Sequence, residues 1–447
     1  MSSNHSQLAA VVMAAGLGTR MRSATPKHLH PLLGRRVVDW VLEAARDAGA
    51  GRIVVVVSPE TRGDLDDATV EVAVQERPLG TGDAVASAAN ALHRFTGLIL
   101  VLDAAAPLLT AEHLRALIDE HGRSGAQVTL LSLEPGFELP YGRVIRADDG
   151  SVRAIVEHKD ASPEQRAVRE LNSSIYVFES SALWPALASL DAANAQGELY
   201  LTDTIAAIVA AGGRAAAYRC PEPEAAIGIN NRAELAQAAG ILRDRLNEKH
   251  MLAGVTVVDP ATTWIEATVE IEQDATIHPF TVLSGRTRVG AGAEVGPHAV
   301  VVDATIGAAV SVGPFCYLRP GTVLETGAKA GTFVEIKNSR IGERTKVPHL
   351  SYIGDAEIDA DTNIAAGNIT ANFPHRPGLP KGRTRIGKNV KTAIHNSFLA
   401  PVTVGDDAWI AAGSVISEDV PPGSLAGFPP KQTTKEGWVY EHGKRDD

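Results

Sequence analysis

The amino-acid sequence predicts two domains of different fold class, an α/β domain followed by a parallel β-helix. In the first half, short apolar runs alternate with amphipathic helical patterns. In the second half, an aliphatic residue returns at every sixth position through most of residues 271–416. Helices and strands repeat about every 3.6 and two residues, so a period of six is typical of the hexapeptide repeats of a parallel β-helix. We expect the α/β domain at 1–230, a linker helix at 231–252, the β-helix at 253–431 and a C-terminal arm at 432–447.

The first predicted strand, residues 8–13, leads into a glycine-containing loop, AAGLGTRMRSATPKHL. This loop carries three cations, Arg20, Arg22 and Lys27. Free backbone N–H groups beside cations suit a phosphate group. The loop lacks the Lys-Ser/Thr ending of a P-loop, and Met21 replaces the third glycine of G-x-G-x-x-G. On its own it therefore leaves an ordinary turn as the alternative to a nucleotide site.

Further strands are expected at residues 53–57 and 98–102, with a helix at 38–48. Such alternation predicts a parallel sheet whose binding site lies at the carboxyl ends of its strands. In the linker segment, apolar residues follow one another at steps of three and four, which predicts a helix. These residues are Leu235, Ala239, Leu242 and Leu246.

Three series of hexads define the β-helix, and each hexad is expected to form one short strand and one turn. Stacked aliphatic side chains would fill the interior of a triangular prism, and because a solenoid cannot close on itself we expect a covering segment at each end. A Val/Gly-rich sandwich is the alternative, but it would show period-two alternation with turns about every 8 to 12 residues. The series are Ile271, Ile277, Leu283, Val289, Val295 and Val301; then Ile306, Val312, Leu318, Leu324, Ala330 and Ile336; then Ile386, Phe398, Val404, Ile410 and Ile416.

Composition excludes several classes of protein. The 447-residue chain has a formal net charge of -11 and no basic stripe, which argues against a dedicated nucleic-acid binder. Its two cysteines, Cys220 and Cys316, lie far apart and predict neither a disulfide framework nor a metal cluster, in keeping with a reducing cytoplasm. We find no signal peptide and no apolar run long enough to span a bilayer. We expect a cytoplasmic protein that acts on small molecules, without a membrane partner.

Several motifs occur together and in order along nearly the whole chain: AAGLGTRMRSATPKHLHPL, PLGTGDAV, YGRVIR, IVEHKDA, the pair Asn230-Asn231 and the hexad array. This set resembles the bifunctional bacterial family that makes UDP-N-acetylglucosamine. The resemblance implies a Rossmann-like α/β nucleotidyltransferase domain, a left-handed β-helix and a homotrimer. It also implies that the β-helix acetylates glucosamine-1-phosphate with acetyl-CoA, and that the first domain then joins the product to UTP.

The resemblance assigns roles to individual residues of the first domain. Arg20 and Lys27 match the cations that hold the triphosphate, and Asn230 matches one of two metal ligands. Gly142, Glu157 and Asn172 match sugar contacts. The residues matched to the nucleotide are Ala14, Ala15, Gly16, Arg20, Lys27, Gln75, Gly80 and Thr81.

One position departs from the family pattern at the metal. The second ligand should be the Asp of a Gly-Asp-Val-Pro-Leu segment, but this segment reads LVLDAAAPLLT and the matching residue is Ala105. Magnesium needs hard oxygen ligands, and an alanine methyl group supplies none. Asp103 lies on the same strand face, about 6 to 7 Å back along the strand, so it could substitute only for a shifted metal. We therefore expect this domain to keep its fold but to be slow or inactive with magnesium.

The resemblance also assigns the second chemistry, acetyl transfer, to the β-helix. His349 matches the general base, and an imidazole titrates near neutral pH. Arg319, Lys337 and Tyr352 match ligands of the acceptor phosphate, and Asn363 matches a sugar contact. Matches to the acetyl-CoA site are Ala366, Asn372, Phe373 and Ala412.

Departures occur on the acetyl-CoA side as well. The family's Asn-Tyr-Asp-Gly loop reads Asn372-Phe373-Pro374-His375, followed by the extra residues RPGLPKGR, and its Gly-Ser-Asp segment reads Ala393-Ile394-His395. Loss of two hydroxyl groups should reshape the donor pocket. The C-terminal arm resembles one that reaches a neighbouring subunit, and its Trp438 is either a packing anchor or a ligand contact.

Three hypotheses follow. The first is an acetyl-CoA-dependent N-acetyltransferase, acting on glucosamine-1-phosphate or a related amine, whose nucleotidyltransferase domain is impaired and whose use of Mg²⁺ is open. The second is a complete bifunctional enzyme that makes UDP-N-acetylglucosamine from glucosamine-1-phosphate, acetyl-CoA and UTP. The third is a non-catalytic trimeric scaffold or nucleotide-sugar sensor.

Overall fold

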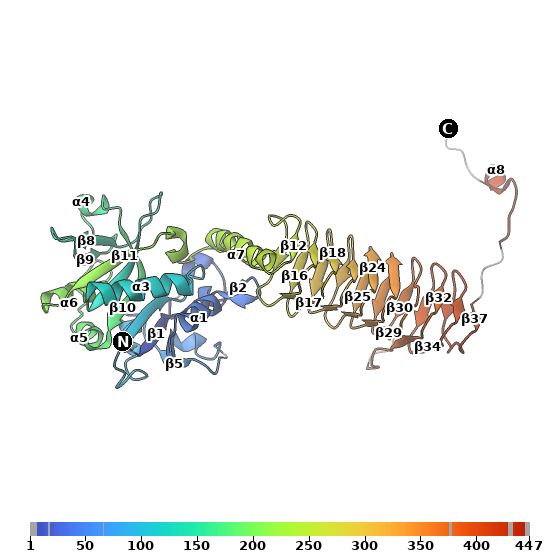
Figure 1. Ribbon diagram of the computed structural model, residues 1–447, viewed down its shortest axis with the longest axis horizontal. Helices are drawn as coiled ribbons and strands as arrows, with labels where there is room; N and C mark the ends of the chain where they lie inside the picture. The colour runs from blue at the N-terminus through green and yellow to red at the C-terminus, as the bar shows by residue number, and fades with distance from the viewer. Residues whose placement is uncertain (1–6, 17, 66, 375–377, 428–431, 443–447) are drawn as a thin grey trace. The chain divides into compact units, whose positions relative to one another are not determined.

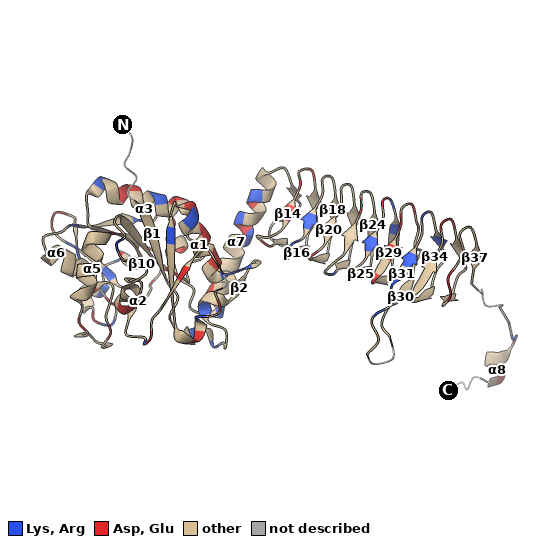
Figure 2. Cartoon of the chain, turned by 90° about the horizontal axis from the view of Figure 1, so that it is seen from below, with Lys and Arg blue, Asp and Glu red and all other residues tan. Residues whose placement is uncertain are grey.

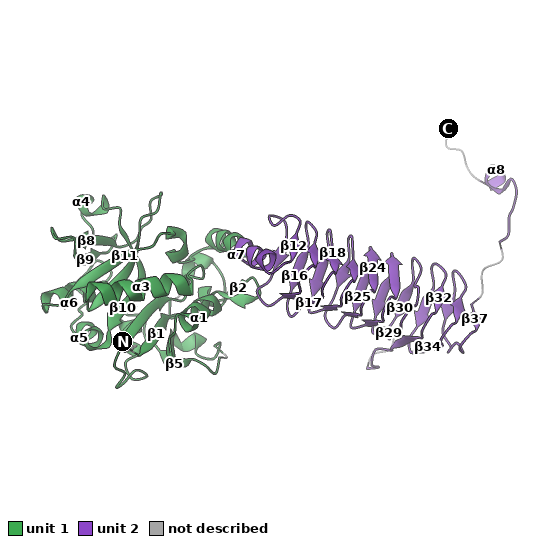
Figure 3. Ribbon diagram, viewed as in Figure 1, with its two compact units in different colours: residues 1–242 green, residues 243–447 purple. Residues whose placement is uncertain are grey.

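The computed structural model describes residues 7–16, 18–65, 67–374, 378–427 and 432–442. The chain forms two compact units, Met1–Leu242 and Arg243–Asp447 (Figure 3). The boundary between them falls inside one long helix, α7 (Arg232–Leu252). Among the residues described, no helix is both long and apolar enough to cross a membrane.

The first unit is built on one mixed sheet. Its first four strands in sheet order pair in parallel, as predicted, whereas β10 runs antiparallel to both of its neighbours, β6 and β7. The prediction of a parallel sheet is therefore confirmed for the first four strands and is wrong at β10. Parallel pairing requires a long crossover, and the chain instead reaches β10 from a β8–β9 hairpin through a single helical turn, α4 (Pro163–Arg166). In sheet order the strands are β5 (Glu71–Val74), β4 (Arg52–Val57), β1 (Leu8–Met13), β6 (Leu98–Asp103), β10 (Leu171–Glu179), β7 (Val128–Leu133), β11 (Ala215–Arg219), β9 (Val152–Val156) and β8 (Arg143–Arg146).

Helices cover both faces of this sheet (Figure 1). Along β1, Ala10 and Val12 join the core beneath α1 and α3, while Ala9 and Val11 join the core on the opposite face beneath α2, α5 and α6. Burial on both faces explains why β1 reads as an unbroken apolar run rather than an alternating one. The helices are α1 (Val37–Asp47), α2 (Thr81–Ser87), α3 (Ala111–Ser124), α5 (Ser180–Ala188) and α6 (Asp203–Ala210).

The second unit is a left-handed parallel β-helix with three flat faces (Figure 1). One face runs in described strands from β13 (Trp264–Ile265) to β36 (Val415–Ile416), and the next from β14 (Glu270–Ile271) to β34 (Val402–Val404). The third runs from β12 (Thr256–Val257) to β27 (Lys346–His349) and resumes from β32 (Lys391–Thr392) to β37 (Leu425–Ala426). Bridges from Lys346 to Asn363 and from Asn363 to Lys391 connect its two parts.

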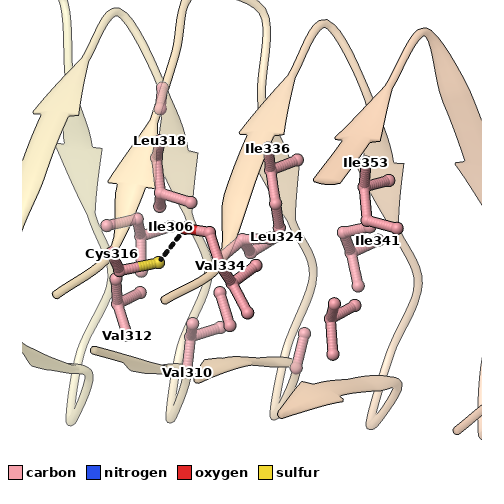
Figure 4. Close-up of a cluster of buried hydrophobic side chains, with 14 of the residues drawn as sticks. Ile306, Val310, Val312, Cys316, Leu318, Leu324, Val334, Ile336, Ile341 and Ile353 are labelled. Atoms are coloured by element: carbon pink, nitrogen blue, oxygen red, sulfur yellow. Dashed lines mark hydrogen bonds between the residues drawn. The ribbon is translucent and has the colours of Figure 1, made fainter. Parts of the chain in front are cut away.

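The predicted hexad positions form the interior of the β-helix, where the aliphatic side chains stack from coil to coil (Figure 4). Ile271 is partly buried, and the other hexad residues are at most 5% exposed. The one-residue slip in the sequence pattern is a shorter turn: Leu283 pairs with Val301 eighteen positions on, whereas Val289 pairs with Ile306 seventeen positions on. The Cys316 thiol lies in this core and donates to the carbonyl of Val334 at 3.1 Å.

The second half of α7 covers the first coil of the β-helix. Asn247 donates from Nδ2 to the carbonyls of Pro260 and Thr263, both at 3.0 Å, and the Arg243 guanidinium lies 5.1 Å from the centre of the Trp264 ring. This helix supplies the covering segment that a solenoid needs at its N-terminal end. Beyond the last coil the described chain ends in a short helix, α8 (Trp438–His442), where Trp438 stacks on His442. Residues 443–447 of the predicted arm lie outside the described part.

Candidate functional site

The first candidate site begins where β1 ends. From Met13 the chain passes through Ala14, Ala15 and Gly16 into a loop in which Gly18 has φ +59°. A Cβ atom at Gly18 would lie 2.9 Å from the Cβ of Lys27. Glycine therefore allows both the left-handed turn and the close approach of Lys27 to the loop. The arrangement brings backbone groups and a lysine to the carboxyl end of a central parallel strand.

A cavity of about 590 Å³ opens at this edge of the sheet. All eight residues assigned to the nucleotide line it, and so does Asn230. On its far side Gln75 donates to the carbonyl of Gly80 at 3.0 Å and to Asp83 at 2.8 Å. Gly80 precedes α2 with φ +118°, and a Cβ atom there would meet the carbonyl oxygen of Leu199 at 2.5 Å. The structure thus brings these residues together, and their role in nucleotide binding stays a prediction.

The three residues assigned to the sugar lie close together but are not among the residues that line this cavity. The Asn172 N–H donates to the Gly142 carbonyl at 2.8 Å, and a Cβ atom on Gly142 would lie 3.5 Å from both carboxylate oxygens of Glu157. The Thr202 hydroxyl donates to Glu157 at 3.2 Å. Burial raises the pKa of Glu157 above its ordinary value. A partly buried carboxylate that holds its proton more tightly is suited to hydrogen-bond a hydroxyl-rich ligand.

The metal position differs from the family pattern in the structure as it does in the sequence. Ala105 is fully buried, and its carbonyl accepts the N–H of Ile229 at 2.7 Å. Asn230 lines the cavity, and its Oδ1 accepts from Arg20 at 2.9 Å. Asp103, the last residue of β6, also lines the cavity. In the described part of the chain, no group of three or more His, Cys, Asp or Glu side chains is placed to hold a metal ion.

The second candidate site lies on the β-helix, on the face that contains β22 (Tyr317–Leu318), β25 (Glu335–Lys337) and β28 (Tyr352–Gly354). Strand register places Arg319, Lys337 and Gly354 in one column on successive coils. Arg319 pairs with Glu335 at 2.7 Å. The close approach of Lys381 lowers the pKa of Lys337, and the charge of Arg319 adds to this effect. Cations that lie close together in this way favour binding of an anion such as a phosphate.

A corner of the β-helix carries the predicted base. Lys346, Asn363, Lys391 and Trp409 pair in register on successive coils. Three residues after each of them lie His349, Ala366, Ile394 and Ala412, so these four also occupy equivalent positions one coil apart. The predicted base, His349, therefore lies in the same column as Ala366 and Ala412, the two alanines assigned to acetyl-CoA. His349, the first residue of the column, is exposed. Ile394 is the one bulky aliphatic side chain in the column, and half of its surface is exposed.

The loop between β30 (Ile369–Ala371) and β31 (Thr384–Ile386) begins where the chain turns from one face of the β-helix to the next, and it projects from the β-helix (Figure 2). Asn372, at its base, is buried and donates from its side chain to Asp355. Phe373 is 72% exposed. His375, Arg376 and Pro377 lie outside the described residues. Asn372 is therefore held at the base of the loop, whereas Phe373 lies at the surface. Near the other end of the loop, Lys381 lies close to Lys337.

Sequence reasoning missed several residues that these sites contain. His28, Ser174, Gln196 and Glu198 line the first cavity, and Lys381 joins the cations of the second site. Burial lowers the pKa of His28 to about 4, with Lys27 and Arg36 adding to the effect, so the imidazole is neutral at pH 7. Lys381 was the easiest of these to find, because it is the one lysine in the extra residues RPGLPKGR.

Comparison with known proteins identifies the family. Residues 10–207 match the family model described as a MobA-like NTP transferase domain. The chain is 48% identical to "Bifunctional protein GlmU" of Streptomyces avermitilis, over 96% of this chain and 94% of the relative. The proteins of the same name from Streptomyces coelicolor and Mycobacterium ulcerans are 47% and 44% identical, over 96% and 97% of this chain and 94% and 93% of their own. Because these identities extend over nearly the full length of both chains, this protein belongs to the GlmU family.

Proposed function

We propose that the chain is a transferase with two active sites, an acetyl-CoA-dependent N-acetyltransferase in the β-helix and a uridylyltransferase in the α/β unit. The name "bifunctional" carried by its relatives favours this complete enzyme over the version with an impaired first domain. One observation carries the proposal: by strand register, His349 is the first residue of the column that contains Ala366 and Ala412. The substrates are those that the family resemblance implies, glucosamine-1-phosphate, acetyl-CoA and UTP.

In the β-helix, Arg319, Lys337 and Lys381 would hold the acceptor phosphate, since three cations concentrate positive charge on one face. His349 would take a proton from the acceptor amine, which releases its lone pair. That lone pair attacks the thioester carbonyl, the C–N bond forms, the C–S bond breaks, and the coenzyme A thiol leaves with a proton. Asn372, held by Asp355, would fix the loop that borders the acetyl group.

In the α/β unit, a phosphate oxygen of N-acetylglucosamine-1-phosphate would attack the α-phosphorus of UTP, and pyrophosphate would leave. Arg20 and Lys27 would offset the charge that develops on the phosphoryl oxygens. Gln75 would contact the base, because its side chain is held in place by Gly80 and Asp83. A divalent cation would add charge neutralisation between the phosphates. Asn230 offers it one amide oxygen in the cavity, and Ala105 offers it none.

The full-length chain tests this proposal in two parallel assays. With acetyl-CoA and glucosamine-1-phosphate, free thiol should accumulate; with N-acetylglucosamine-1-phosphate, UTP and a divalent cation, pyrophosphate should accumulate. Two silent assays, combined with thermal stabilisation by UDP-N-acetylglucosamine, would show a non-catalytic sensor instead.

A second candidate keeps only the acetyltransferase, and the methyl group of Ala105 favours it. It predicts thiol release without pyrophosphate under any divalent cation. For both candidates we propose a cytoplasmic homotrimer, by analogy with the family.

A further inference from the structure

We propose that Asp103 supplies the metal-binding carboxylate of the first cavity, together with Asn230, in place of the side chain missing at Ala105. The inference rests on the proposed uridylyltransferase function and names the residue that lets that function survive. It concerns a carboxylate at a position to which the family pattern gives no metal role.

A turn of the backbone places the Asp103 carboxylate next to the backbone N–H of Ala105. On a continuous strand the two residues would be about 6 to 7 Å apart. However, β6 ends at Asp103, and the chain turns at once through Ala104 and Ala105. In this turn Oδ1 of Asp103 accepts the N–H of Ala105 at 2.9 Å. The carboxylate thus lies beside the backbone of residue 105, which corrects the expectation that it would remain a full two-residue step behind.

The neighbouring segment leaves room for this carboxylate. A Cβ atom on Gly228 would lie 2.8 Å from Oδ2 of Asp103, so only glycine lets the carboxylate come this close to the 228–230 segment. Asn230 folds back onto the same glycine, donating from Nδ2 to the Gly228 carbonyl at 3.0 Å. Gly228 is therefore in contact with both proposed ligands, which also line the same cavity. The Oδ1 of Asn230 accepts one bond from Arg20 and, as a carbonyl oxygen, retains a second lone pair.

The charges in the cavity require a cation at this place once a nucleotide is bound. Among the described residues, Asp103 has no lysine or arginine partner, and its carboxylate accepts a hydrogen bond from the neutral N–H of Ala105. A carboxylate that shares a cavity with a triphosphate repels it unless a cation lies between them. Carboxylate, amide and phosphate oxygens together form the hard ligand set that Mg²⁺ and Mn²⁺ accept. The surroundings of Asp103 therefore fit a metal ion better than they fit a bare nucleotide.

The test measures how strongly Mn²⁺ improves UTP binding to the full-length chain by titration calorimetry. Wild-type protein should bind UTP about tenfold or more tightly with Mn²⁺ than without it, the size of effect expected when a group that supports a metal is intact. In Asp103→Asn the gain should disappear, while metal-free UTP should bind at least as tightly as to wild type because the repulsion is removed. Retained metal-free binding also shows that the variant is folded.

Asp148→Asn is the matched control, since it removes the same charge from an exposed carboxylate of the same unit that does not line the cavity. It should keep the full gain from Mn²⁺. If Asp103→Asn keeps that gain, or if wild type shows none, the inference is overturned. Pyrophosphate release by wild type is read separately, so a failure of Asp103 as ligand is distinguishable from a failure of the uridylyltransferase function.

Discussion

At the scale of single residues, the clearest departure from the family pattern is at the expected metal position of the first cavity. Ala105 carries a methyl group where the family pattern has a metal ligand, and the carboxylate of Asp103 accepts a hydrogen bond from the backbone N–H of Ala105. The sequence predicted the missing carboxylate but not this hydrogen bond. A turn directly after β6 decides where the carboxylate lies, and the sequence predicts the end of this strand to within one residue but not the geometry of the turn that follows.

The first prediction at this scale concerns the proposed base. His349→Ala should reduce coenzyme A release about 10²- to 10⁴-fold, because an aliphatic side chain cannot accept the amine proton. The matched control is His93→Ala, which removes an exposed imidazole from the other unit and should leave thiol release unchanged. Stopped-flow thiol detection measures both variants. Equal rates for His349→Ala and wild type would exclude this histidine as the base.

The second prediction concerns the lysine that sequence reasoning missed. Lys381→Met should raise KM for the phosphorylated acceptor about tenfold with little change in kcat, because it removes a charge-assisted phosphate contact made equally before and during the reaction. The pKa of Lys337 should move back toward its ordinary value in this variant. Lys388→Met removes another exposed lysine of the same unit and should leave KM unchanged. A fall in kcat alone would contradict the assignment to acceptor binding.

At the scale of elements, the hexad pattern predicted the interior of the β-helix residue by residue. Adjacent valines on β19 (Val300–Val302) test it as a matched pair, since Val301 is fully buried and Val300 is 39% exposed. Val301→Ala should lower the free energy of unfolding by about 2 kcal/mol, from lost transfer energy and a residual cavity. Val300→Ala should change it by less than about 0.5 kcal/mol.

Thiol labelling during urea unfolding reads each unit separately, because Cys316 is buried in the β-helix and Cys220 in the α/β unit. Val301→Ala should lower the urea midpoint for Cys316 and not for Cys220. Equal shifts from both valine substitutions would show that the period of six does not mark the interior.

The α/β unit should lose stability in mild acid. Burial lowers the pKa of His121 to about 4, whereas an unfolded histidine titrates near 6.5. The folded state therefore favours the neutral imidazole, so its stabilising contribution is complete above pH 6.5 and is lost progressively as the pH falls toward 4, by up to about 3 kcal/mol. His28 acts in the same direction.

The check is the urea midpoint for labelling of Cys220 at pH 7 and at pH 5. It should fall in wild type and fall less in His121→Gln, which cannot gain the proton. A midpoint that is the same at both pH values in wild type would contradict the account.

Long-range features of the elements could not be predicted in the same way. The apolar run of β1, the helical period of α1 and the six-residue period of the hexads are local patterns, so the sequence alone places these elements. The antiparallel direction of β10 depends on which edge a hairpin leaves, and the meeting of Lys381 with Lys337 depends on the path of a loop. Such features arise from tertiary contacts that a single sequence does not display.

At the scale of the whole molecule, one chain contains two units whose proposed reactions are consecutive. Under the proposed function, the acetylated sugar phosphate released by the β-helix would be the acceptor that the α/β unit requires. We therefore predict that the α/β unit uses the product released by the β-helix, and that the α/β unit is active without a carboxylate at position 105.

One incubation tests this most directly: the full-length chain with acetyl-CoA, glucosamine-1-phosphate, UTP and Mg²⁺ or Mn²⁺, read by mass spectrometry over time. The account predicts that N-acetylglucosamine-1-phosphate forms first and is then converted to UDP-N-acetylglucosamine. Accumulation of N-acetylglucosamine-1-phosphate with no UDP-sugar under either metal would contradict it and would show an acetyltransferase with an inactive first unit.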